Sequence, residues 1–284
     1  MDAREAMRPM SDHAEESPSG RKPTTLLRLA QMHRAGEKIA VLTCYEALFA
    51  RLMDEAGVDV LLVGDSLGMV VQGRPDTLPV SIEEMAYHTA CVARGNRSAW
   101  IVADMPFGSY HQSIEQAIGN ASRLFQAGAK MVKLEGAWAA PSIRALIERG
   151  MPVCAHLGFT PQAVHAVGGY RIQGRDADGA ALLHRQAREV AEAGAQLLVL
   201  ELVPSALARE LTAQLPIPTI GIGAGRDCSG QVLVMHDMLG VTPGKLPRFA
   251  RNFLDGSGGI GEAVRCYVRD VKSGAYPDDS LHGY

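Results

Sequence analysis

The chain has 284 residues, of which 47% are hydrophobic and 21% charged, and its formal net charge at pH 7 is −3. This composition is ordinary for a globular protein with a full core. It excludes the strongly basic surface that nucleic acid or an anionic membrane would need, and no apolar run reaches the length of a membrane-spanning helix. We therefore expect a small molecule as the partner.

Residues 1–22 are rich in charge and lack the apolar stretch of a signal peptide, so we expect a disordered tail there. The five cysteines show no CxxC spacing, and Cys44 and Cys154 lie in or beside apolar strand-like runs. Reduced thiols and a cytoplasmic location fit this pattern.

Short β-branched runs alternate with helical stretches from about residue 39 onward, which is typical of repeated βα units around a parallel sheet. A helix is expected before the first strand, from Thr24 to Arg34, and two after the last, at about 247–254 and 259–273. Eight strands are predicted, at about 39–43, 59–63, 100–104, 130–134, 152–156, 196–200, 218–222 and 231–235.

Eight βα units predict a TIM (β/α)8 barrel with an extra N-terminal helix and C-terminal helices, forming one domain over 23–273. Residues 274–284 are expected to be a tail on the surface. An open doubly wound sheet is the alternative. It would normally carry a glycine-rich fingerprint after its first strand, where this chain has the sequence TCYE at 43–46.

Local signals mark several helix ends. Ser81 with Glu84, and Ser113 with Gln116, have the spacing of a capping box, in which two groups satisfy free N–H groups at a helix start. Three helices are followed by an Ala-Gly-Ala or Ala-Gly-Val triplet, whose glycine suits the left-handed conformation found after a helix. These glycines are Gly57, Gly128 and Gly194.

Charged or hydrogen-bonding residues stand at the ends of five predicted strands. In a barrel, the carboxyl ends of the strands surround one shared site, so these residues are expected to meet. They are Asp65 and Ser66 after the second strand, Asp104 at the end of the third, Lys133 and Glu135 in the fourth, His156 in the fifth, and Glu201 after the sixth.

Asp65, Asp104 and Glu135 form an oxygen-only set that suits a hard divalent cation such as Mg²⁺. Zinc fits less well, because no cluster of cysteine and histidine accompanies them. Any one of these acids alone would as readily cap a helix or pair with an arginine. Three of them at successive strand ends favour a metal site.

Lys133 and Glu135 are two residues apart on one strand, so both side chains point to the same side of the barrel wall. The lysine then needs an anionic partner. It could form an ion pair with Glu135, act as a Schiff-base nucleophile, or clamp a substrate carboxylate. We favour the clamp, because a barrel that holds a metal ion can stabilise an enolate without an imine.

Glu201 follows five apolar residues, a partly desolvated position that suits a general base. A glutamate at a helix N-terminus ahead of Pro204 would explain the same sequence equally well. His156 fits a hydrogen-bonded core histidine better than a donor to a substrate oxygen, unless a cavity lies beside it.

Two glycine-rich segments remain. Residues 221–225, after the seventh strand, suit a phosphate-binding turn, but any tight turn or close backbone contact would use the same glycines. Residues 158–176 form the longest connection from a strand to a helix. The glycines around Tyr170 and Arg171 suit either a lid over the site or an ordered loop at a subunit contact.

Taken in order, these stretches resemble the ketopantoate hydroxymethyltransferase family of pantothenate biosynthesis, from Lys22 to about Pro277. The most specific pieces are LLVGDSLGMVVQGRPDTLPV (61–80), ADMPFGSY (103–110), MVKLEG (131–136), HLGFTPQ (156–162), GGYRIQGR (168–175), LLVLELVP (197–204) and IGIGAGRDCSGQVLVMHDMLG (220–240).

The resemblance implies a TIM barrel in the cytoplasm, assembled as a homodecamer of two pentameric rings. It implies transfer of a hydroxymethyl group from 5,10-methylenetetrahydrofolate to 3-methyl-2-oxobutanoate, giving 2-dehydropantoate. Carried over residue by residue, it implies Mg²⁺ ligation by Asp65 and Asp104, with Glu135 at the metal directly or through water. The α-keto acid would be bound by Ser66, Asp104 and Lys133, and Glu201 would accept a proton.

Three other functions stay open. A Mg²⁺-dependent carbon–carbon lyase of the phosphoenolpyruvate/pyruvate barrel group would also place acids around an enolate. An aldolase would form a Schiff base at Lys133. A non-catalytic barrel would bind the keto acid without exchanging its C3 proton, although the presence of Asp65, Asp104, Lys133 and Glu201 argues against it.

Overall fold

The computed structural model describes residues 21–284, and eight parallel strands form a closed barrel in which β8 pairs with β1. The strands are β1 (Ile39–Thr43), β2 (Val60–Val63), β3 (Trp100–Asp104), β4 (Met131–Glu135), β5 (Val153–Gly158), β6 (Leu197–Glu201), β7 (Thr219–Ile222) and β8 (Gly230–Leu233). The predicted barrel is confirmed, and each strand lies within two residues of its predicted position. A doubly wound sheet is excluded.

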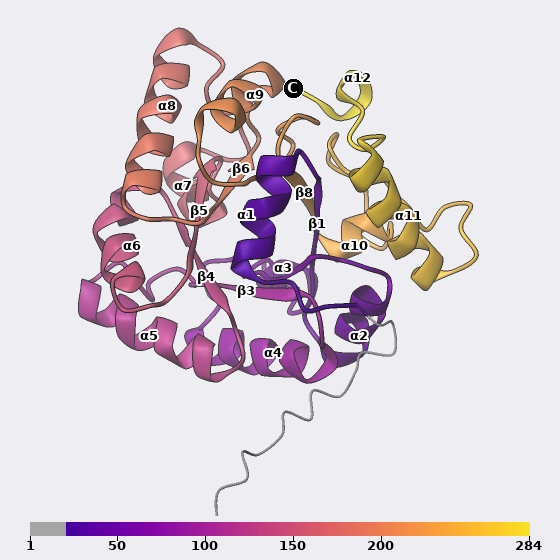
Figure 1. Ribbon diagram of the computed structural model, residues 1–284, viewed down its shortest axis with the longest axis horizontal. Coiled ribbons are helices and arrows are strands. Elements are labelled where there is room, and N and C mark those ends of the chain that lie inside the picture. The colour runs from indigo at the N-terminus through magenta and orange to yellow at the C-terminus, as the bar shows by residue number, and fades with distance from the viewer. Residues whose placement is uncertain (1–20) are drawn as a thin grey trace, which may run out of the picture.

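Helices surround the strands (Figure 1). They are α1 (Leu26–Ala35), α2 (Ala47–Glu55), α3 (Leu67–Val70), α4 (Ile82–Gly95), α5 (Ile114–Gln126), α6 (Ala140–Ile147), α7 (Val164–Val167), α8 (Ala177–Glu192), α9 (Ser205–Gln214), α10 (Met235–Met238), α11 (Ile260–Ser273) and α12 (Asp279–His282), with 3-10 turns at Ala137–Ala139 and Pro161–Ala163.

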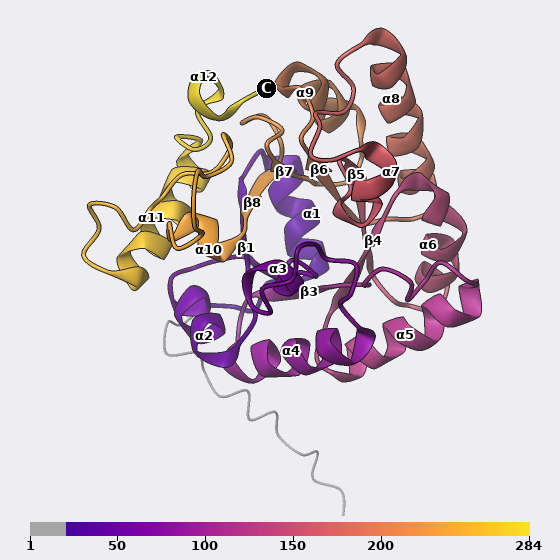
Figure 2. The same cartoon turned by 180° about the vertical axis from the view of Figure 1, so that it is seen from behind.

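Helix α1, which the sequence predicts, covers the end of the barrel at which the strands begin. Its side chains Leu29 and Met32 are buried in one cluster with the apolar residues that fill the barrel interior, such as Val41 and Val102. In Figure 1 this helix crosses in front of the strands, and Figure 2 shows the opposite end, with α3 and α10, from behind. Apolar packing thus fills one end of the barrel and leaves the other for polar groups.

The predicted helix signals are largely confirmed. Ser81 and Glu84 form a complete capping box, whereas Ser113 accepts from the Gln116 N–H without the reciprocal bond. The Gln116 side chain accepts instead from the backbone N–H of Gln112. The three glycines after α2, α5 and α8 have φ angles of 92°, 111° and 100°, as their Ala-Gly triplets predict.

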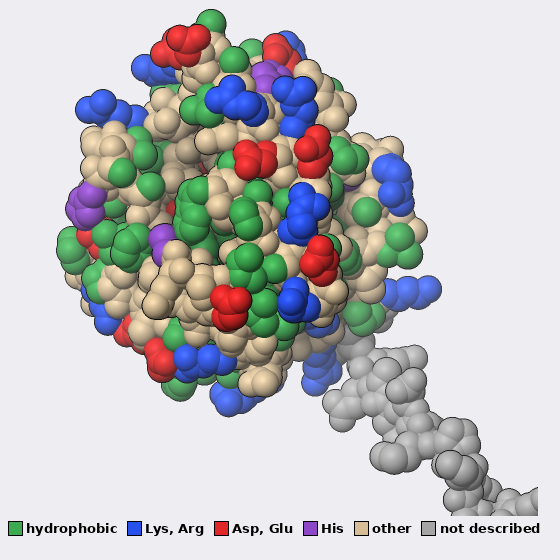
Figure 3. Space-filling model, turned by 90° about the vertical axis from the view of Figure 1, so that its left-hand side faces the viewer, with side chains coloured by type: hydrophobic (Ala, Val, Ile, Leu, Met, Phe, Trp, Pro, Cys, Tyr) green, Lys and Arg blue, Asp and Glu red, His purple; other side chains and the backbone are tan. Residues whose placement is uncertain are grey.

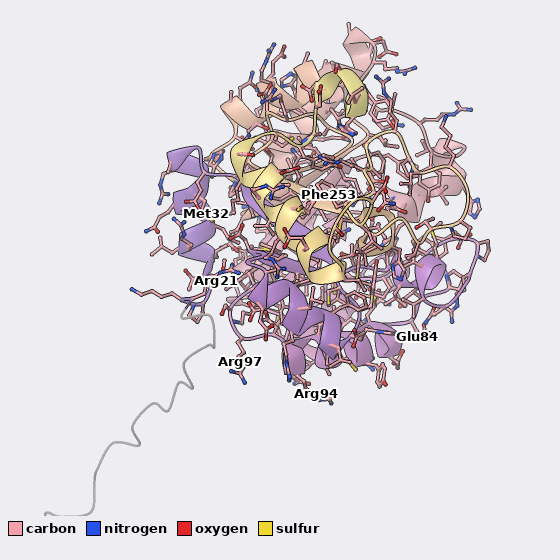
Figure 4. All side chains as sticks on the ribbon, turned by 90° about the vertical axis from the view of Figure 1, so that its right-hand side faces the viewer. Arg21, Met32, Glu84, Arg94, Arg97 and Phe253 are labelled. Carbon is pink, nitrogen blue, oxygen red and sulfur yellow. The ribbon has the colours of Figure 1, made fainter. Side chains whose placement is uncertain are left out.

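The predicted helix at 247–254 is wrong. The Asn252 side chain accepts hydrogen bonds from the backbone N–H groups of Leu254 and Asp255, and the Phe253 N–H donates to Met238 O, so turns replace the helical ladder. The Phe253 ring, labelled beside α11 in Figure 4, packs edge-on against Tyr267 at a centroid distance of 5.4 Å.

The segment after Gly274, expected to be a tail on the surface, has both buried and exposed side chains, and Leu281 is 64% exposed. Tyr276 is only 3% exposed, and its hydroxyl donates to Phe249 O. Farther along, the carbonyl of Tyr284 accepts from the Ser205 N–H at the start of α9. Burial of an aromatic ring explains why this short segment is held in place.

Of the expected N-terminal tail, residues 1–20 lie outside the described part of the chain. Arg21, labelled in Figure 4, is held at the barrel: it donates to Val58 O over 2.8 Å and lies 3.3 Å from Asp59 Oδ1. Positive and negative side chains are interspersed on the face shown in Figure 3. No helix within residues 21–284 is long and apolar enough to cross a membrane. All five cysteines are free thiols, as predicted.

Candidate active site

Strand register brings the polar strand ends together at the end of the barrel opposite α1. In the parallel ladder Asp104 is the partner of Lys133, and Glu135 is the partner of His156. Glu201 lies next in the ring, opposite Gly158. One cavity of about 850 Å³ is lined by all seven residues that the sequence singles out. Their predicted convergence is therefore present.

The buried carboxylates of Asp65 and Asp104 are neighbours. Asp104 Oδ2 accepts a hydrogen bond of 3.0 Å from the Asp65 backbone N–H. Asp104 Oδ1 lies 3.3 Å from Lys133 Nζ but has no hydrogen-bond partner. Beside them, the Ser66 hydroxyl is 2.9 Å from the hydroxyl of buried Tyr45. One buried carboxylate oxygen beside Lys133 thus accepts no hydrogen bond.

Lys133 is buried among acids. Its Nζ lies 3.4 Å from Glu135 Oε1 and 3.1 Å from His156 Nδ1, in addition to its contact with Asp104. The ion pair with Glu135, one of the three roles considered for this lysine, is therefore formed. It leaves Lys133 on the cavity wall, where a substrate anion can also reach it.

His156 connects this cluster to Glu201. Its Nδ1 is 3.2 Å from Glu135 Oε1, and its Nε2 is 3.2 Å from Glu201 Oε2, although that second contact lacks hydrogen-bond geometry. Burial and Lys133 act to lower the pKa of His156, but the two glutamates outweigh them and raise it. His156 is both a buried, partnered histidine and a wall of the cavity.

Glu201 ends β6 with its side chain 12% exposed, whereas that of His156 is only 3% exposed. Helix α9 begins at Ser205 with Pro204 as its N-cap, and Glu201 does not cap it. The next residue, Leu202, has φ = 49°, a left-handed conformation that is unusual for a branched side chain. The chain thus turns sharply just after the glutamate, which lines the cavity.

Gln162 links the acids, a role that its sequence motif does not reveal. Its backbone N–H donates to Glu135 Oε2, and its side-chain amide donates to Asp65 Oδ2 over 2.8 Å and to Met105 O. The amide oxygen accepts from the buried Tyr110 hydroxyl. The sequence gives no local signal for this role, because the partners of Gln162 are 27 to 97 residues away along the chain.

The cluster shifts the pKa values of its members in opposite directions. Burial, together with repulsion from Asp104 and Glu135, raises the pKa of Asp65 well above its usual value. Burial also raises the pKa of Asp104, with Lys133 opposing it. For Glu135, burial opposes ionisation, but Lys133 and His156 outweigh it and lower the pKa to about 2. The pKa of Lys133 is raised, since the acids around it outweigh burial.

The donor set fits a divalent cation. Three buried carboxylates face a single lysine, and Asp104 Oδ1 has no hydrogen-bond partner. Within residues 21–284, no group of three or more His, Cys, Asp or Glu side chains is arranged so that it could hold a metal ion, so at most two carboxylates are in place. Both Glu135 oxygens are engaged by neighbours, which leaves Asp65 and Asp104 as the available donors. One or two carboxylates plus waters is the usual coordination of Mg²⁺.

The two glycine-rich segments border the same cavity. Tyr170 and Arg171 of the connection 158–176 line it, and closure of this connection as a lid, or its use in a subunit contact, stays a prediction. Gly223 has φ = 63°, and a Cβ there would lie 2.9 Å from the Phe249 ring and 3.1 Å from that of Tyr284. Close packing therefore accounts for the glycine after β7.

Comparison with known proteins identifies the family. The model of the ketopantoate hydroxymethyltransferase family matches residues 23–279. The chain belongs to this family. A 3-methyl-2-oxobutanoate hydroxymethyltransferase of Leptothrix cholodnii is 59% identical, covering 97% of this chain and 99% of the relative. The enzyme of Methylibium petroleiphilum named 3-methyl-2-oxobutanoate hydroxymethyltransferase 2 is 57% identical, covering 97% and 100%.

Two solved structures of similar fold are much less similar to this chain in sequence. Oxaloacetate acetylhydrolase superposes with a TM-score of 0.59 at 15% identity, covering 78% of this chain and 84% of that one. The 2,3-dimethylmalate lyase, a member of the PEP mutase/isocitrate lyase superfamily, gives 0.55 at 16% identity, covering 73% and 80%. These likenesses show that this chain shares their barrel fold.

Replacing Asp65 by asparagine is predicted to stabilise the metal-free protein at neutral pH. A carboxyl whose pKa is raised on folding destabilises the native state once the pH exceeds its unfolded-state pKa. The neutral amide avoids this and can still accept from Gln162. Calorimetry should show a higher Tm at pH 7, by about 2–4 °C for each kcal/mol relieved, and a gain that disappears as the pH falls toward 4. A lower Tm at pH 7 would contradict the repulsion.

Gln162→Leu is predicted to destabilise the fold by about 1–3 kcal/mol, because it leaves the partners of the amide buried without hydrogen bonds. Urea unfolding measures the change. Gln112→Leu is the matched control, since that side chain is exposed and forms no hydrogen bond within the described residues. Equal midpoints for the two variants would show that Gln162 does not organise the acids.

Proposed function

We propose that the cavity at the barrel mouth transfers a hydroxymethyl group from 5,10-methylenetetrahydrofolate to 3-methyl-2-oxobutanoate, giving 2-dehydropantoate for pantothenate biosynthesis. The two relatives above are named for hydroxymethyl transfer to this acid. One structural observation carries the proposal. The same cavity holds a buried ammonium group for an anion, two carboxylates for a divalent cation, and a less buried glutamate for a proton.

The keto acid is an anion, and Lys133 is the cation that its carboxylate meets on the cavity wall. The raised pKa of Lys133 keeps this group charged at neutral pH. The Ser66 hydroxyl, held by Tyr45, is placed to donate a second hydrogen bond. Two fixed donors orient the acid, which lowers the entropic part of the barrier.

Asp65 and Asp104 are the residues that would hold Mg²⁺, and Glu135 would add negative charge beside them, at the metal directly or through water. When bound, Mg²⁺ supplies a Lewis acid that stabilises negative charge on the keto oxygen as the C3 proton leaves. Asp104 Oδ1, which accepts no hydrogen bond, supports this role for the aspartates.

Glu201 is the proposed proton acceptor. Its carboxylate lines the cavity, and His156 Nε2 lies 3.2 Å behind it, where the imidazole can steady the charge of the glutamate. The electron pair of the broken C3–H bond then forms the bond to the one-carbon unit, whose two bonds to folate nitrogens break. Water supplies the hydroxyl group. The second proton of the water and the proton taken by Glu201 go to the two nitrogens, and tetrahydrofolate leaves.

The alternatives are less well supported. A Schiff-base lysine needs a lowered pKa to be nucleophilic, whereas the acids around Lys133 raise its pKa. The carbon–carbon lyase shares the barrel, but likeness at 16% identity shows the fold alone. Borohydride should therefore trap no keto acid on Lys133. The protein should also show no carbon–carbon lyase activity in the absence of folate.

Assembly and location stay predictions. The family resemblance implies a homodecamer of two pentameric rings in the cytoplasm. Sedimentation velocity of the full chain would measure the mass of the assembly directly.

Glu201→Gln is predicted to keep keto-acid binding and to lose C3 proton exchange by about 10²–10⁴-fold, because the amide cannot accept the proton. Proton NMR in D₂O, with 3-methyl-2-oxobutanoate and Mg²⁺ but no folate, measures the exchange. Glu192→Gln, an exposed change on α8, is the control. Normal exchange by the Glu201 variant would remove this residue from the base role.

Asp65→Ala and Asp104→Ala are each predicted to weaken the binding of metal and keto acid together, because the ion would join the two. Titration calorimetry with Mg²⁺ alone, and then with the keto acid added, measures both affinities. A chelator should stop proton exchange by the unmodified protein. Exchange that survives metal removal would contradict the assignment.

A further inference from the structure

We propose that Leu202 is a positioning residue for the proposed base, Glu201. The left-handed backbone conformation of Leu202, rather than its side chain, holds the Glu201 carboxylate in place at the cavity. This inference rests on the proposed function, which assigns proton abstraction to Glu201. It adds a reason why the residue after the base has a conformation that leucine rarely adopts.

The backbone of Leu202 is the first observation. Within residues 21–284, Leu202 is the only residue other than glycine with a positive φ angle, 49°. This conformation is unfavourable for a residue with a Cβ, and it persists only where the surrounding structure imposes it. Strained residues of this kind gather at functional sites, and this one directly follows a glutamate that lines the cavity.

Four backbone hydrogen bonds impose the conformation, and they come from both sides of the turn. The carbonyls of Glu201 and Leu202 accept from the connection 158–176, and the N–H groups of the two residues after Glu201 donate to carbonyls at the end of β7. The four bonds are Phe159 N–H to Glu201 O (2.8 Å), Gln173 N–H to Leu202 O (2.8 Å), Leu202 N–H to Ile222 O (3.0 Å) and Val203 N–H to Gly223 O (3.2 Å). The turn is therefore held by segments on either side of β6.

The neighbouring strand accommodates the turn. Gly158, the last residue of β5, is the register partner of Glu201 and has φ = 90°. A Cβ at this position would collide with the Glu201 carbonyl oxygen. The missing side chain lets that carbonyl come close enough to bond to the Phe159 N–H. A second unusual backbone position thus supports the one at Leu202.

The turn also changes which side chains face the cavity. Along β6 the side chains alternate, so Val199 and Glu201 line the cavity, whereas Leu200 is buried in a core cluster with helix residues such as Leu207. An extended residue 202 would lie on the same side as Leu200. Leu202 instead lines the cavity. The left-handed residue therefore breaks the alternation directly after the glutamate.

Two other roles for Leu202 have to be separated from positioning. Only Leu202, Val203 and Pro204 join β6 to α9, so the turn could serve packing alone. The apolar side chain could also act directly, by excluding water from the carboxylate beside it. The first role would affect stability without affecting proton transfer, and the second would depend on the side chain and not on the backbone.

Two variants of Leu202 distinguish the backbone from the side chain. Leu202→Ile keeps an apolar side chain of the same volume, but a β-branched residue strongly disfavours the left-handed region. Leu202→Asn makes the side chain polar, but asparagine adopts that region readily. Leu200→Ile is the matched control, because it makes the same change on β6 at a position outside the cavity.

Proton NMR in D₂O, with 3-methyl-2-oxobutanoate and Mg²⁺ but no folate, gives kcat and KM for C3 exchange, and calorimetry gives the Tm. We expect Leu202→Ile to lower kcat by about 10–100-fold, since displacing a reacting group slightly has an effect of this size. The KM for the keto acid should stay normal, because Lys133 and Ser66 bind the acid. Leu202→Asn should keep the normal kcat, and Leu200→Ile should change neither constant.

The outcomes separate failure of the positioning role from failure of the proposed function. If the unmodified protein neither exchanges nor transfers, the proposed function is wrong and the positioning role falls with it. If the unmodified protein exchanges and Leu202→Ile keeps the normal kcat, whatever its Tm, the turn serves packing alone and the function stands.

Two further results would overturn the positioning role. A loss of kcat in Leu202→Asn as large as that in Leu202→Ile would show that the apolar side chain matters. A KM for the keto acid that rises in Leu202→Ile as much as kcat falls would show that the whole cavity is disturbed. If Leu202→Ile does not fold, a normal kcat for Leu202→Asn supports the backbone role, and a lost kcat overturns it.

Discussion

One buried ammonium group makes the mouth of this barrel possible. Lys133 Nζ lies within 3.4 Å of the carboxylates of both Asp104 and Glu135, on a strand enclosed by its neighbours. Buried charges persist only when they are paired and hydrogen-bonded, and here the lysine supplies the pairing while Gln162 supplies hydrogen bonds to two of the acids. The negative charge that the lysine does not balance is available to a divalent ion. The imbalance that costs stability is the one that the proposed metal ion would relieve.

The barrel keeps apolar packing and buried charge at opposite ends. At the end covered by α1, apolar side chains fill the interior and no charge has to be buried. At the opposite end, parallel pairing sets Asp104 beside Lys133 and Glu135 beside His156. The register of β4 against its two neighbours therefore determines which charged side chains meet. A shift of one residue in that register would turn the lysine out of the cavity. The packed end thus holds the strands in the register on which the polar end depends.

Chain segments distant in sequence complete the mouth. Gln162 follows β5 yet bonds to Asp65 after β2, and Tyr284 packs over Gly223 after β7. Such contacts cannot be recognised from a local sequence pattern, because the two residues in contact lie far apart along the chain. This is why the sequence does not predict the role of Gln162 or the burial of Tyr276. The sequence also predicts a helix at 247–254, where the Asn252 side chain instead accepts from the backbone N–H groups of Leu254 and Asp255.

The sequence by itself determined the barrel and the identity of the polar strand ends. Alternation of apolar runs with amphipathic stretches, capping residues such as Ser81, and glycines after helices are local signals, and buried parallel strands must be apolar along their length. The roles of Asp65 and Glu201 came from family resemblance, since an isolated acid fits a helix cap as well as a catalytic site. Only the tertiary structure decided which charges share a hydrogen bond, which oxygen of Asp104 accepts none, and how large the cavity beside them is. Those properties depend on distances between strands, which the order of residues along one strand does not contain.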